Sequence, residues 1–283
     1  MSKAALLIGI NYLDSPGNTL NGCINDVINM RNMLIDAYGY DSTNITVLRE
    51  DTNQKPTRAN IINSLTSIIA QSKNLKEIWI HYTGHGNQID DINRDETDNL
   101  DEIIVPLDYA ENGVITDDVI FNIIKNSKCP TMLIFDSCNS GTICDLMWNF
   151  NATSPTQVTA VKTNVNPIKN PNIFCFSGCK DTQTSAEIYN RYSQQSCGAI
   201  SNAISECLRF NKHNVDVKKI YLDVVAYIML QGLTQIPQLS TSSQKPNYRI
   251  SRTTIKEANN AHVSSSSVLK MTMKNILNPT ITI

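Results

Sequence analysis

Short apolar runs alternate with amphipathic helical patterns along most of this chain, and this alternation most constrains its fold. The runs are short enough for buried strands and are bounded by turn residues. They fall at 4–10, 45–48, 77–82, 131–135 and 173–176. Strands that alternate with helices predict a parallel sheet covered by right-handed crossovers. We therefore expect an α/β fold with a mostly parallel central sheet and helices on both faces.

The segments between these runs carry the helical period. Apolar residues recur every three or four positions, so that each segment has one apolar face. Thr116 precedes one segment as a cap, and Gly39 follows the first segment as a stop. The predicted helices span 22–38, 57–69, 116–124, 198–210 and 220–230.

Composition narrows the class of protein. The 283 residues include 24 basic and 26 acidic side chains, which gives a formal net charge of −2. Binding nucleic acid or anionic membrane by bulk electrostatics needs a basic surface, so we expect neither partner. With 41% hydrophobic and 18% charged residues, the chain is too apolar to be disordered. It has no apolar run of membrane-spanning length and no secretory cleavage site, so we expect a soluble, cytoplasmic protein.

The eight cysteines and four histidines argue against a zinc or redox protein. No two cysteines form a CxxC pair, and no histidine stands at zinc-finger spacing from a cysteine. Several cysteines stand in apolar runs, where a thiol behaves as a small hydrophobe. We expect most of them to be reduced core residues and one or two to do chemistry.

Two predicted strands run directly into residues that suit catalysis. One continues into HYTGHG at 81–86, which places His85 between two glycines, and another continues into IFDSCNSG at 134–141, which contains Cys138. Ligands and chemistry collect at the carboxyl ends of parallel strands, where a thiolate and a histidine form a nucleophile–base pair. On these signals alone a packed thiol beside a loose Gly-His-Gly pattern remains the alternative.

Further motifs surround these two. They include LNGCINDV at 20–27, DEIIVPLD at 101–108, VITDD at 114–118, FSGCKDTQTSAE at 176–187 and QIPQLSTSS at 235–243. Together the motifs make the chain resemble the metacaspases, which are caspase-fold cysteine peptidases, over most of residues 3–250. The resemblance implies a type I-like catalytic core without an amino-terminal extension. Its expected parts are a large segment at 1–150, an exposed linker at 151–170, a small segment at 171–250 and a tail at 251–283.

The resemblance also implies catalytic roles. His85 would be the acid/base and Cys138 the nucleophile, with the backbone amides of Gly86 and Cys138 as the oxyanion hole. Asn139 stands where the family more often has His, but this position is not the base, so we expect activity to survive. The alternative is a catalytically weak caspase-fold module that binds calcium or a partner, and it rests on Asn139 and the missing extension.

Cleavage after Arg or Lys is a further implication. The matching pocket positions are Cys23, Asp26, Thr83 and Asp136, whose two carboxylates would pair with a cationic side chain. Taken alone, Asp26 would only be a favourable charge in the first turn of a helix. The expected partners are protein or peptide substrates with a basic residue before the cleaved bond, bound by a monomer. Possible autoprocessing sites are Lys162, Lys169, Arg252, Lys256, Lys270 and Lys274.

The resemblance finally implies an activating calcium ion and no organic cofactor. The ligands would be Asp101, Asp117, Asp118 and Asp145. Carboxylates from separate loops suit calcium, which also relieves their mutual repulsion. In the alternative interpretation, Asp117 and Asp118 are helix N-terminal charges and Asp145 is a surface acid. The single-loop EF-hand pattern is absent.

Overall fold

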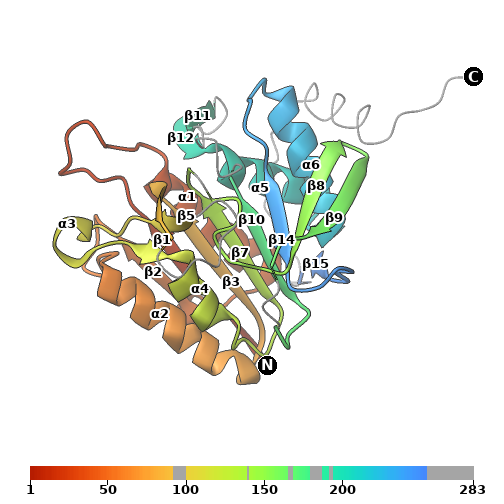
Figure 1. The fold of residues 1–283 in the computed structure, drawn as a ribbon, viewed down its shortest axis with the longest axis horizontal. Coiled ribbons are helices and arrows are strands. Elements are labelled where there is room, and N and C mark those ends of the chain that lie inside the picture. The colour runs from red at the N-terminus through yellow and green to blue at the C-terminus, as the bar shows by residue number, and fades with distance from the viewer. Residues whose placement is uncertain (92–99, 139, 165–167, 179–186, 191–193, 254–283) are drawn as a thin grey trace, which may run out of the picture.

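The five predicted strands lie side by side, from one edge, in an eight-stranded sheet of the computed structural model, which describes residues 1–91, 100–138, 140–164, 168–178, 187–190 and 194–253. The strand order is β2-β1-β3-β7-β10-β14-β8-β9 (Figure 1). Strands β2 to β10 in this order pair in parallel, and the last three pair antiparallel. The bounds are β1 Ser2–Gly9, β2 Ile45–Arg49, β3 Leu75–Thr83, β7 Thr131–Asp136, β8 Trp148–Ser154, β9 Gln157–Lys162, β10 Ile173–Ser177 and β14 Gln238–Thr241. The predicted α/β class with a mostly parallel sheet is confirmed.

Alternate side chains of the central strands point to opposite faces of the sheet and build two cores. In β1, Leu7 packs into one core and Leu6 into the other. The first core is covered by three helices and the second by two (Figure 1). The three are α1 Cys23–Tyr38, α5 Ala199–Phe210 and α6 Val217–Leu230, and the two are α2 Arg58–Gln71 and α4 Asp117–Ile124. Helices on both faces are therefore confirmed as well.

Local capping explains where several helices begin and end. Thr57 and Thr116 each accept a hydrogen bond from the backbone N–H three residues further on, at 3.3 and 3.5 Å. This is the N-cap arrangement that satisfies a donor at the start of a helix. Gly39 follows α1 with a φ of 66°, a left-handed conformation that suits glycine at a helix end. The predicted boundaries at Thr116 and Gly39 are confirmed.

Shorter elements surround the main sheet. A three-stranded sheet adjoins the end of β3, and two strand pairs lie elsewhere in the fold. These strands are β4 Gly86–Asp90, β5 Leu100–Ile104, β6 Ile115–Thr116, β11 Glu187–Asn190, β12 Gln195–Gly198, β13 Asn214–Asp216 and β15 Arg249–Ser251. The short helices are α3 Tyr109–Asn112, η1 Ser42–Asn44 and η2 Ser72–Asn74. Among the described residues, every helix is too short or too polar to cross a membrane.

The segment predicted as an exposed linker contains regular structure that the sequence analysis did not predict. Residues 151–154 and 157–162 belong to β8 and β9, an antiparallel hairpin at the end of the sheet. Phe150 is buried, and the backbone N–H of Ala152 donates to the Tyr221 hydroxyl at 3.1 Å. β9 lies at the edge and its side chains are mostly exposed. Its sequence QVTAVK alternates polar and apolar residues over its first four positions, a strand pattern that the sequence analysis did not use. Residues 165–167 of the predicted linker and 254–283 of the predicted tail lie outside the described residues.

Candidate active site

The register of β3 and β7 brings the two predicted catalytic loops together. Thr83 lies opposite Asp136, so His85 and Cys138 both stand two residues beyond this pair. A Cβ atom placed on Gly86 would lie 2.3 Å from the Cys138 carbonyl oxygen. The two loops are therefore in direct contact, and only a residue without a side chain fits at position 86 unless the backbone moves.

His85 is held by a backbone carbonyl group. Its Nε2 lies 2.6 Å from the carbonyl oxygen of Asn18. A carbonyl only accepts hydrogen bonds, so Nε2 must carry the proton, and in the neutral ring Nδ1 is then the atom that can accept one. His85 also lines a cavity of about 280 Å³ together with Gly86 and Tyr109. The half-buried imidazole is thus available to a group that enters this cavity.

Two buried tyrosines fix the backbone of His85, which the sequence analysis did not foresee. The His85 N–H donates to the Tyr12 hydroxyl at 3.0 Å, and the Tyr82 hydroxyl donates to the His85 carbonyl at 2.7 Å. The Tyr12 ring lies 4.6 Å from the imidazole, and its hydroxyl donates to the Val105 carbonyl at 2.7 Å. Burial raises the pKa of both tyrosines above the usual value, so both hydroxyls stay protonated. Tyr12 was present in the motif LIGINY, but nothing in that motif pointed to this contact.

The turn that carries Cys138 is held in place by the side chain of Ser140. The buried Ser140 hydroxyl donates to the Ser137 carbonyl at 2.9 Å and accepts from the Gly178 N–H at 3.3 Å. The Gly178 carbonyl in turn accepts from the Gln235 side chain at 2.8 Å. Cys138 itself is partly exposed. The motifs around 178 and 235 therefore support the turn of the predicted nucleophile, while Asn139 lies outside the described residues.

The backbone of Gly86 turns its N–H away from the neighbouring strand. The Val105 N–H donates to the His85 carbonyl at 3.2 Å, while Gly86 lies opposite Ile104. In an antiparallel ladder this pattern makes Gly86 and Ile104 a non-hydrogen-bonded pair, so the Gly86 N–H points away from β5. The role of this N–H in an oxyanion hole stays a prediction.

The four residues predicted to bind substrate lie together, close to the loops that carry His85 and Cys138. The Thr83 hydroxyl donates to Asp26 at 3.3 Å, and Thr83 pairs with Asp136 across the strands. Both carboxyl groups are buried, as is Cys23. Burial raises the pKa of Asp26 well above its usual value, and the nearby charge of Asp136 raises it further. Burial also raises the pKa of the Cys23 thiol, and the negative charges of Asp26 and Asp136 raise it further.

The N-terminus of α5 holds these two carboxylates in place. The Gly198 N–H donates to Asp26 and the Ser201 N–H donates to Asp136, each at 2.8 Å. A Cβ on Gly198 would lie 2.1 Å from an Asp136 oxygen, so the helix can approach only because this residue is glycine. His81 contacts the Ser201 hydroxyl at 2.9 Å, and burial lowers its pKa to about 3, so it is neutral and distinct from His85. The motif CGAISNAI contains Gly198 and Ser201, but it did not indicate that their N–H groups bind Asp26 and Asp136.

A third carboxylate, Glu187, lies near Asp26 and Cys23, and the sequence analysis did not single it out. Glu187 accepts hydrogen bonds from the backbone N–H groups of Asn21 and Gly22, at 2.8 and 2.7 Å. Its charge contributes to the raised pKa values of Asp26 and Cys23. Glu187 is the last residue of the motif FSGCKDTQTSAE, and only its acidic side chain could have suggested a role beside Asp26 and Asp136.

The predicted calcium ligands are carboxylates of the right chemistry, but they do not form a ligand set. Asp117 accepts from the backbone N–H groups of Glu102 and Asp118, at 2.9 and 2.8 Å. Burial raises its pKa to about 7, and the charge of Asp101 adds to this effect. Asp145 is buried, so it is not the surface acid of the alternative interpretation. Within the part of the chain that the structure describes, no three acidic, histidine or cysteine side chains converge to hold a metal ion.

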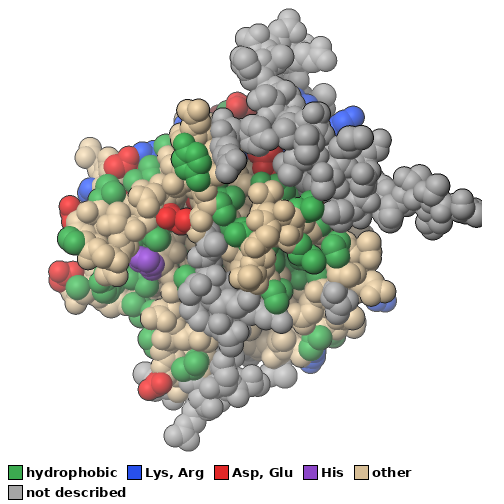
Figure 2. Space-filling model, turned by 90° about the horizontal axis from the view of Figure 1, so that it is seen from above, with side chains coloured by type: hydrophobic (Ala, Val, Ile, Leu, Met, Phe, Trp, Pro, Cys, Tyr) green, Lys and Arg blue, Asp and Glu red, His purple; other side chains and the backbone are tan. Residues whose placement is uncertain are grey.

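The carboxyl ends of the parallel strands form the face shown in Figure 2. An exposed histidine, acidic side chains and hydrophobic side chains all appear on this face.

Comparisons with known proteins point to one family. The family model described as "Metacaspase, peptidase C14 domain" matches residues 3–147. Metacaspase-1 of Saccharomyces cerevisiae is 33% identical over 239 residues, which cover 81% of this chain and 52% of that protein. Metacaspase-1B of Neosartorya fischeri is 32% identical over 291 residues, covering 85% and 69% respectively. The chain thus spans about half to two thirds of the length of these relatives.

The fold has solved counterparts. The crystal structure of caspase-1 from Spodoptera frugiperda superposes with a TM-score of 0.55 at 10% identity, covering 86% of this chain and 87% of that one. At this identity the likeness concerns the fold alone, which is caspase-like. From the matched domain, the relatives and the paired His85 and Cys138 loops, we conclude that the chain belongs to the metacaspase family.

Proposed function

We propose that this chain is a cysteine endopeptidase that cleaves after Arg or Lys. The observation that carries the proposal is the contact between Gly86 and the Cys138 carbonyl, which holds the His85 loop against the Cys138 loop. Membership of the metacaspase family supports the same chemistry.

In the proposed reaction, His85 Nδ1 takes the proton from the Cys138 thiol, and the thiolate attacks the carbonyl carbon of the substrate. The carbonyl electron pair moves onto oxygen, where the N–H groups of Gly86 and Cys138 stabilise the negative charge. The C–N bond then breaks, the amine leaves with the proton from His85, and a thioester remains. Water that gives its proton to His85 hydrolyses the thioester, and the thiol is regenerated.

The preference for a basic side chain rests on the carboxylates of Asp26 and Asp136. Both are buried at the same place, and their mutual repulsion raises the pKa of Asp26. An arginine or lysine side chain between them would offset this repulsion and favour the ionised carboxylates. An acidic side chain would add to the repulsion, so the same pocket would exclude it. Glu187 adds a third negative charge nearby.

The proposal includes activation by calcium, which would require the side chains of its four predicted ligands to move. Three of the four predicted ligands, Asp101, Asp117 and Asp145, are buried carboxylates. Their burial together with the charge of Asp101 near Asp117 supports a cation at this place. Their side chains would have to turn toward a common point, and Asp118 with them, for six to eight oxygens to surround the ion.

Autoprocessing, if the chain carries it out, is expected first at exposed basic residues outside regular structure. Lys169 and Arg252 are exposed and lie in neither a helix nor a strand. Lys162 is exposed but pairs with Trp148 in the β8–β9 hairpin, so its cleavage needs local opening. The other three predicted sites, Lys256, Lys270 and Lys274, lie outside the described residues.

The first prediction concerns the nucleophile. Cys138→Ala should lower turnover of a fluorogenic peptide ending in arginine by at least about 1,000-fold, because the alanine cannot form a thioester. The control is Cys129→Ala, which removes a buried thiol away from the predicted site and should leave the rate close to that of the unmodified chain. A Cys138→Ala chain as active as the unmodified chain would refute the peptidase assignment.

The second prediction concerns the tyrosine that holds His85. Tyr12→Phe keeps the ring beside the imidazole but removes the hydroxyl that binds the His85 N–H. We expect kcat to fall by about 10- to 100-fold with little change in KM, because a misplaced base slows proton transfer. Tyr109→Phe, which alters another residue lining the same cavity, is the control and should keep kcat. A raised KM with unchanged kcat would instead assign Tyr12 to substrate binding.

The third prediction concerns the pocket. Asp26→Asn keeps an oxygen that can accept from the Gly198 N–H but removes the charge. We expect KM for peptides ending in Arg or Lys to rise by at least about tenfold. Asp36→Asn, at an exposed position of the same helix, should leave KM unchanged. If Asp26→Asn retains both KM and the preference for basic residues, the pocket has been placed wrongly.

The fourth prediction concerns the metal. Removal of calcium with a chelator should lower kcat/KM, and restoring calcium should recover it. Asp145→Asn should shift this recovery to higher calcium concentrations, whereas Asp36→Asn should not, because only the former removes a proposed ligand. A rate that is the same with calcium and with chelator would eliminate this site and leave the peptidase proposal intact.

A further inference from the structure

Glu50 is a buried acidic residue that has no part in the reaction proposed above. It directly follows β2 and is 6% exposed. Within the part of the chain that the structure describes, it forms no salt bridge. A buried carboxylate without a positive partner is costly unless hydrogen-bond donors surround it. The groups that donate to Glu50 therefore indicate what its side chain does.

Both donors belong to the backbone of the loop after β1. The Asn11 N–H donates to one carboxylate oxygen, and the Leu13 N–H donates to the other at 3.0 Å. Between these two residues stands Tyr12, whose φ of 54° lies in the left-handed region. This conformation is unfavourable for a residue with a bulky side chain. Turns that contain such a residue direct successive N–H groups to one side, where an anionic group binds them. Glu50 supplies that group and so stabilises the conformation of Tyr12.

The conformation of Tyr12 matters because Tyr12 positions His85. Its hydroxyl accepts from the His85 N–H at 3.0 Å, and its ring lies 4.6 Å from the imidazole. Its carbonyl accepts from the Ser15 N–H, and the Ser15 carbonyl accepts from the Asn18 N–H, each at 3.0 Å. These turns lead to the Asn18 carbonyl, which binds His85 Nε2. Two separate contacts to His85 thus depend on how the chain turns at Tyr12.

Other hydrogen bonds attach the ends of this loop to the fold. The Asn11 carbonyl accepts from the Leu20 N–H at 2.8 Å, and the Asn11 side chain accepts from the Ile24 N–H at 3.2 Å. Neither bond involves Glu50. Loss of the Glu50 carboxylate should therefore loosen the turn at Tyr12 while the loop remains attached at its base.

We propose that Glu50 is a positioning residue for His85. Its carboxylate keeps Tyr12 in the left-handed conformation, and Tyr12 in turn holds the His85 backbone. Glu50 contacts neither the predicted nucleophile nor the predicted substrate pocket through these bonds, so its effect is on the rate of proton transfer. This effect on catalysis rests on the proposed peptidase function.

The first test is the kinetics of Glu50→Gln. Glutamine keeps the shape and one acceptor oxygen, but it places an NH₂ donor against one of the two N–H groups. We expect kcat for a fluorogenic peptide ending in arginine to fall by at least about fivefold with KM unchanged. The control is Asp51→Asn, which removes the charge of the next residue, an exposed acid that pairs with Arg49, and should keep kcat. A folded Glu50→Gln chain with the kcat of the unmodified chain would overturn the proposal.

A double variant separates positioning from a general loss of stability. If Glu50 acts through Tyr12, then Glu50→Gln and Tyr12→Phe disturb the same contact. Their combined loss of kcat should be smaller than the product of the two single losses, by at least about threefold. Single losses that multiply in the double variant would show that Glu50 acts independently of Tyr12.

The closing experiment measures the position of His85 without turnover. Nuclear magnetic resonance follows the exchange with water of the His85 backbone N–H, which the Tyr12 hydroxyl accepts. We expect exchange to be at least about tenfold faster in Glu50→Gln and unchanged in Asp51→Asn. Unchanged exchange in Glu50→Gln would refute the role of Glu50, whatever the activity. If the unmodified chain cleaves no peptide, the proposed peptidase function fails, while this exchange rate still decides whether Glu50 positions His85.

A second variant keeps the test decisive if Glu50→Gln unfolds, as judged by circular dichroism. Glu50→Asp retains the charge, but its side chain is one methylene shorter and cannot reach both N–H groups. It should show the same changes in kcat and in the exchange of the His85 N–H. A Glu50→Asp chain unchanged in both would overturn the proposal.

Discussion

The parallel pairing of β3 with β7 is the interaction on which the rest of the site depends. Its register places Thr83 opposite Asp136, and the two catalytic loops follow at once. A slip of one residue would move one loop about 3.3 Å along the other and turn every side chain of the strand to the wrong face. The two cores prevent this slip, because Ile80 must reach one core and Trp79 the other. Packing far from the site thus determines the relative position of His85 and Cys138.

The first turn of α5 is the second point at which distant parts of the chain meet. It donates backbone hydrogen bonds to Asp26 from α1 and to Asp136 from β7. Buried carboxylates are costly unless such donors surround them, and a helix N-terminus supplies both donors and a favourable dipole. The proposed substrate pocket and the attachment of α5 therefore use the same two side chains. A change from Asp to Asn at either position keeps an oxygen that accepts the α5 N–H, so it removes the charge without removing the hydrogen bond.

Periodicity was enough to predict the five parallel strands of the sheet, the helices on both faces and the edge at which His85 and Cys138 lie, but not β8, β9 and β14. The pocket residues Cys23, Asp26, Thr83 and Asp136 were predicted from a family resemblance, and the structure brings them together. The contacts that position them were not predictable, because they join side chains to backbone groups remote in sequence. The Tyr12 hydroxyl at the His85 N–H is one example.

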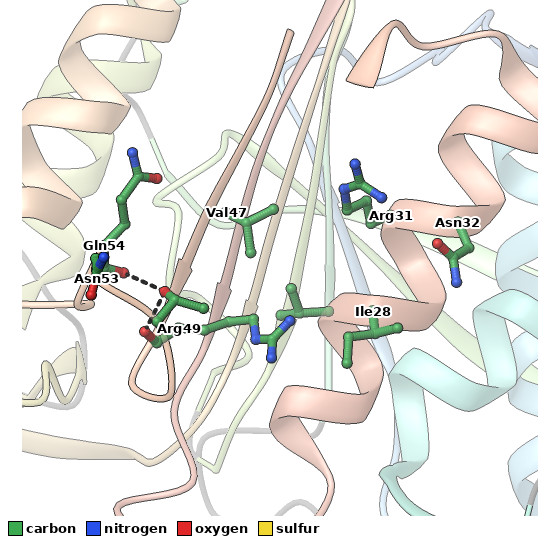
Figure 3. Close-up of a pocket in the computed structure, with 9 residues that line it drawn as sticks. Ile28, Arg31, Asn32, Val47, Arg49, Asn53 and Gln54 are labelled. Atoms are coloured by element: carbon green, nitrogen blue, oxygen red, sulfur yellow. Dashed lines mark hydrogen bonds between the residues drawn. The ribbon is translucent and has the colours of Figure 1, made fainter. Parts of the chain in front are cut away.

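Two further features were not predicted from the sequence. The β8–β9 hairpin alternates apolar and polar residues over WNFNA and QVTA, as half-buried strands do, but its many Asn, Thr and Ser residues also suit a loop. A groove lined by Arg31 and Arg49 lies between α1 and β2 (Figure 3), and it exists only once the helix has packed beside the edge strand. Neither segment alone distinguishes these arginines from ordinary surface charges.

The order of the strands has a consequence for a chain that has been cut. β10 and β14, which follow Lys169, lie between β7 on one side and β8 on the other, and both of these precede Lys169. Two fragments separated at Lys169 would therefore remain interleaved in one sheet, joined by backbone hydrogen bonds on both flanks of the inserted pair. A nicked molecule of this kind would behave as a single particle during size-exclusion chromatography and come apart only under denaturing conditions.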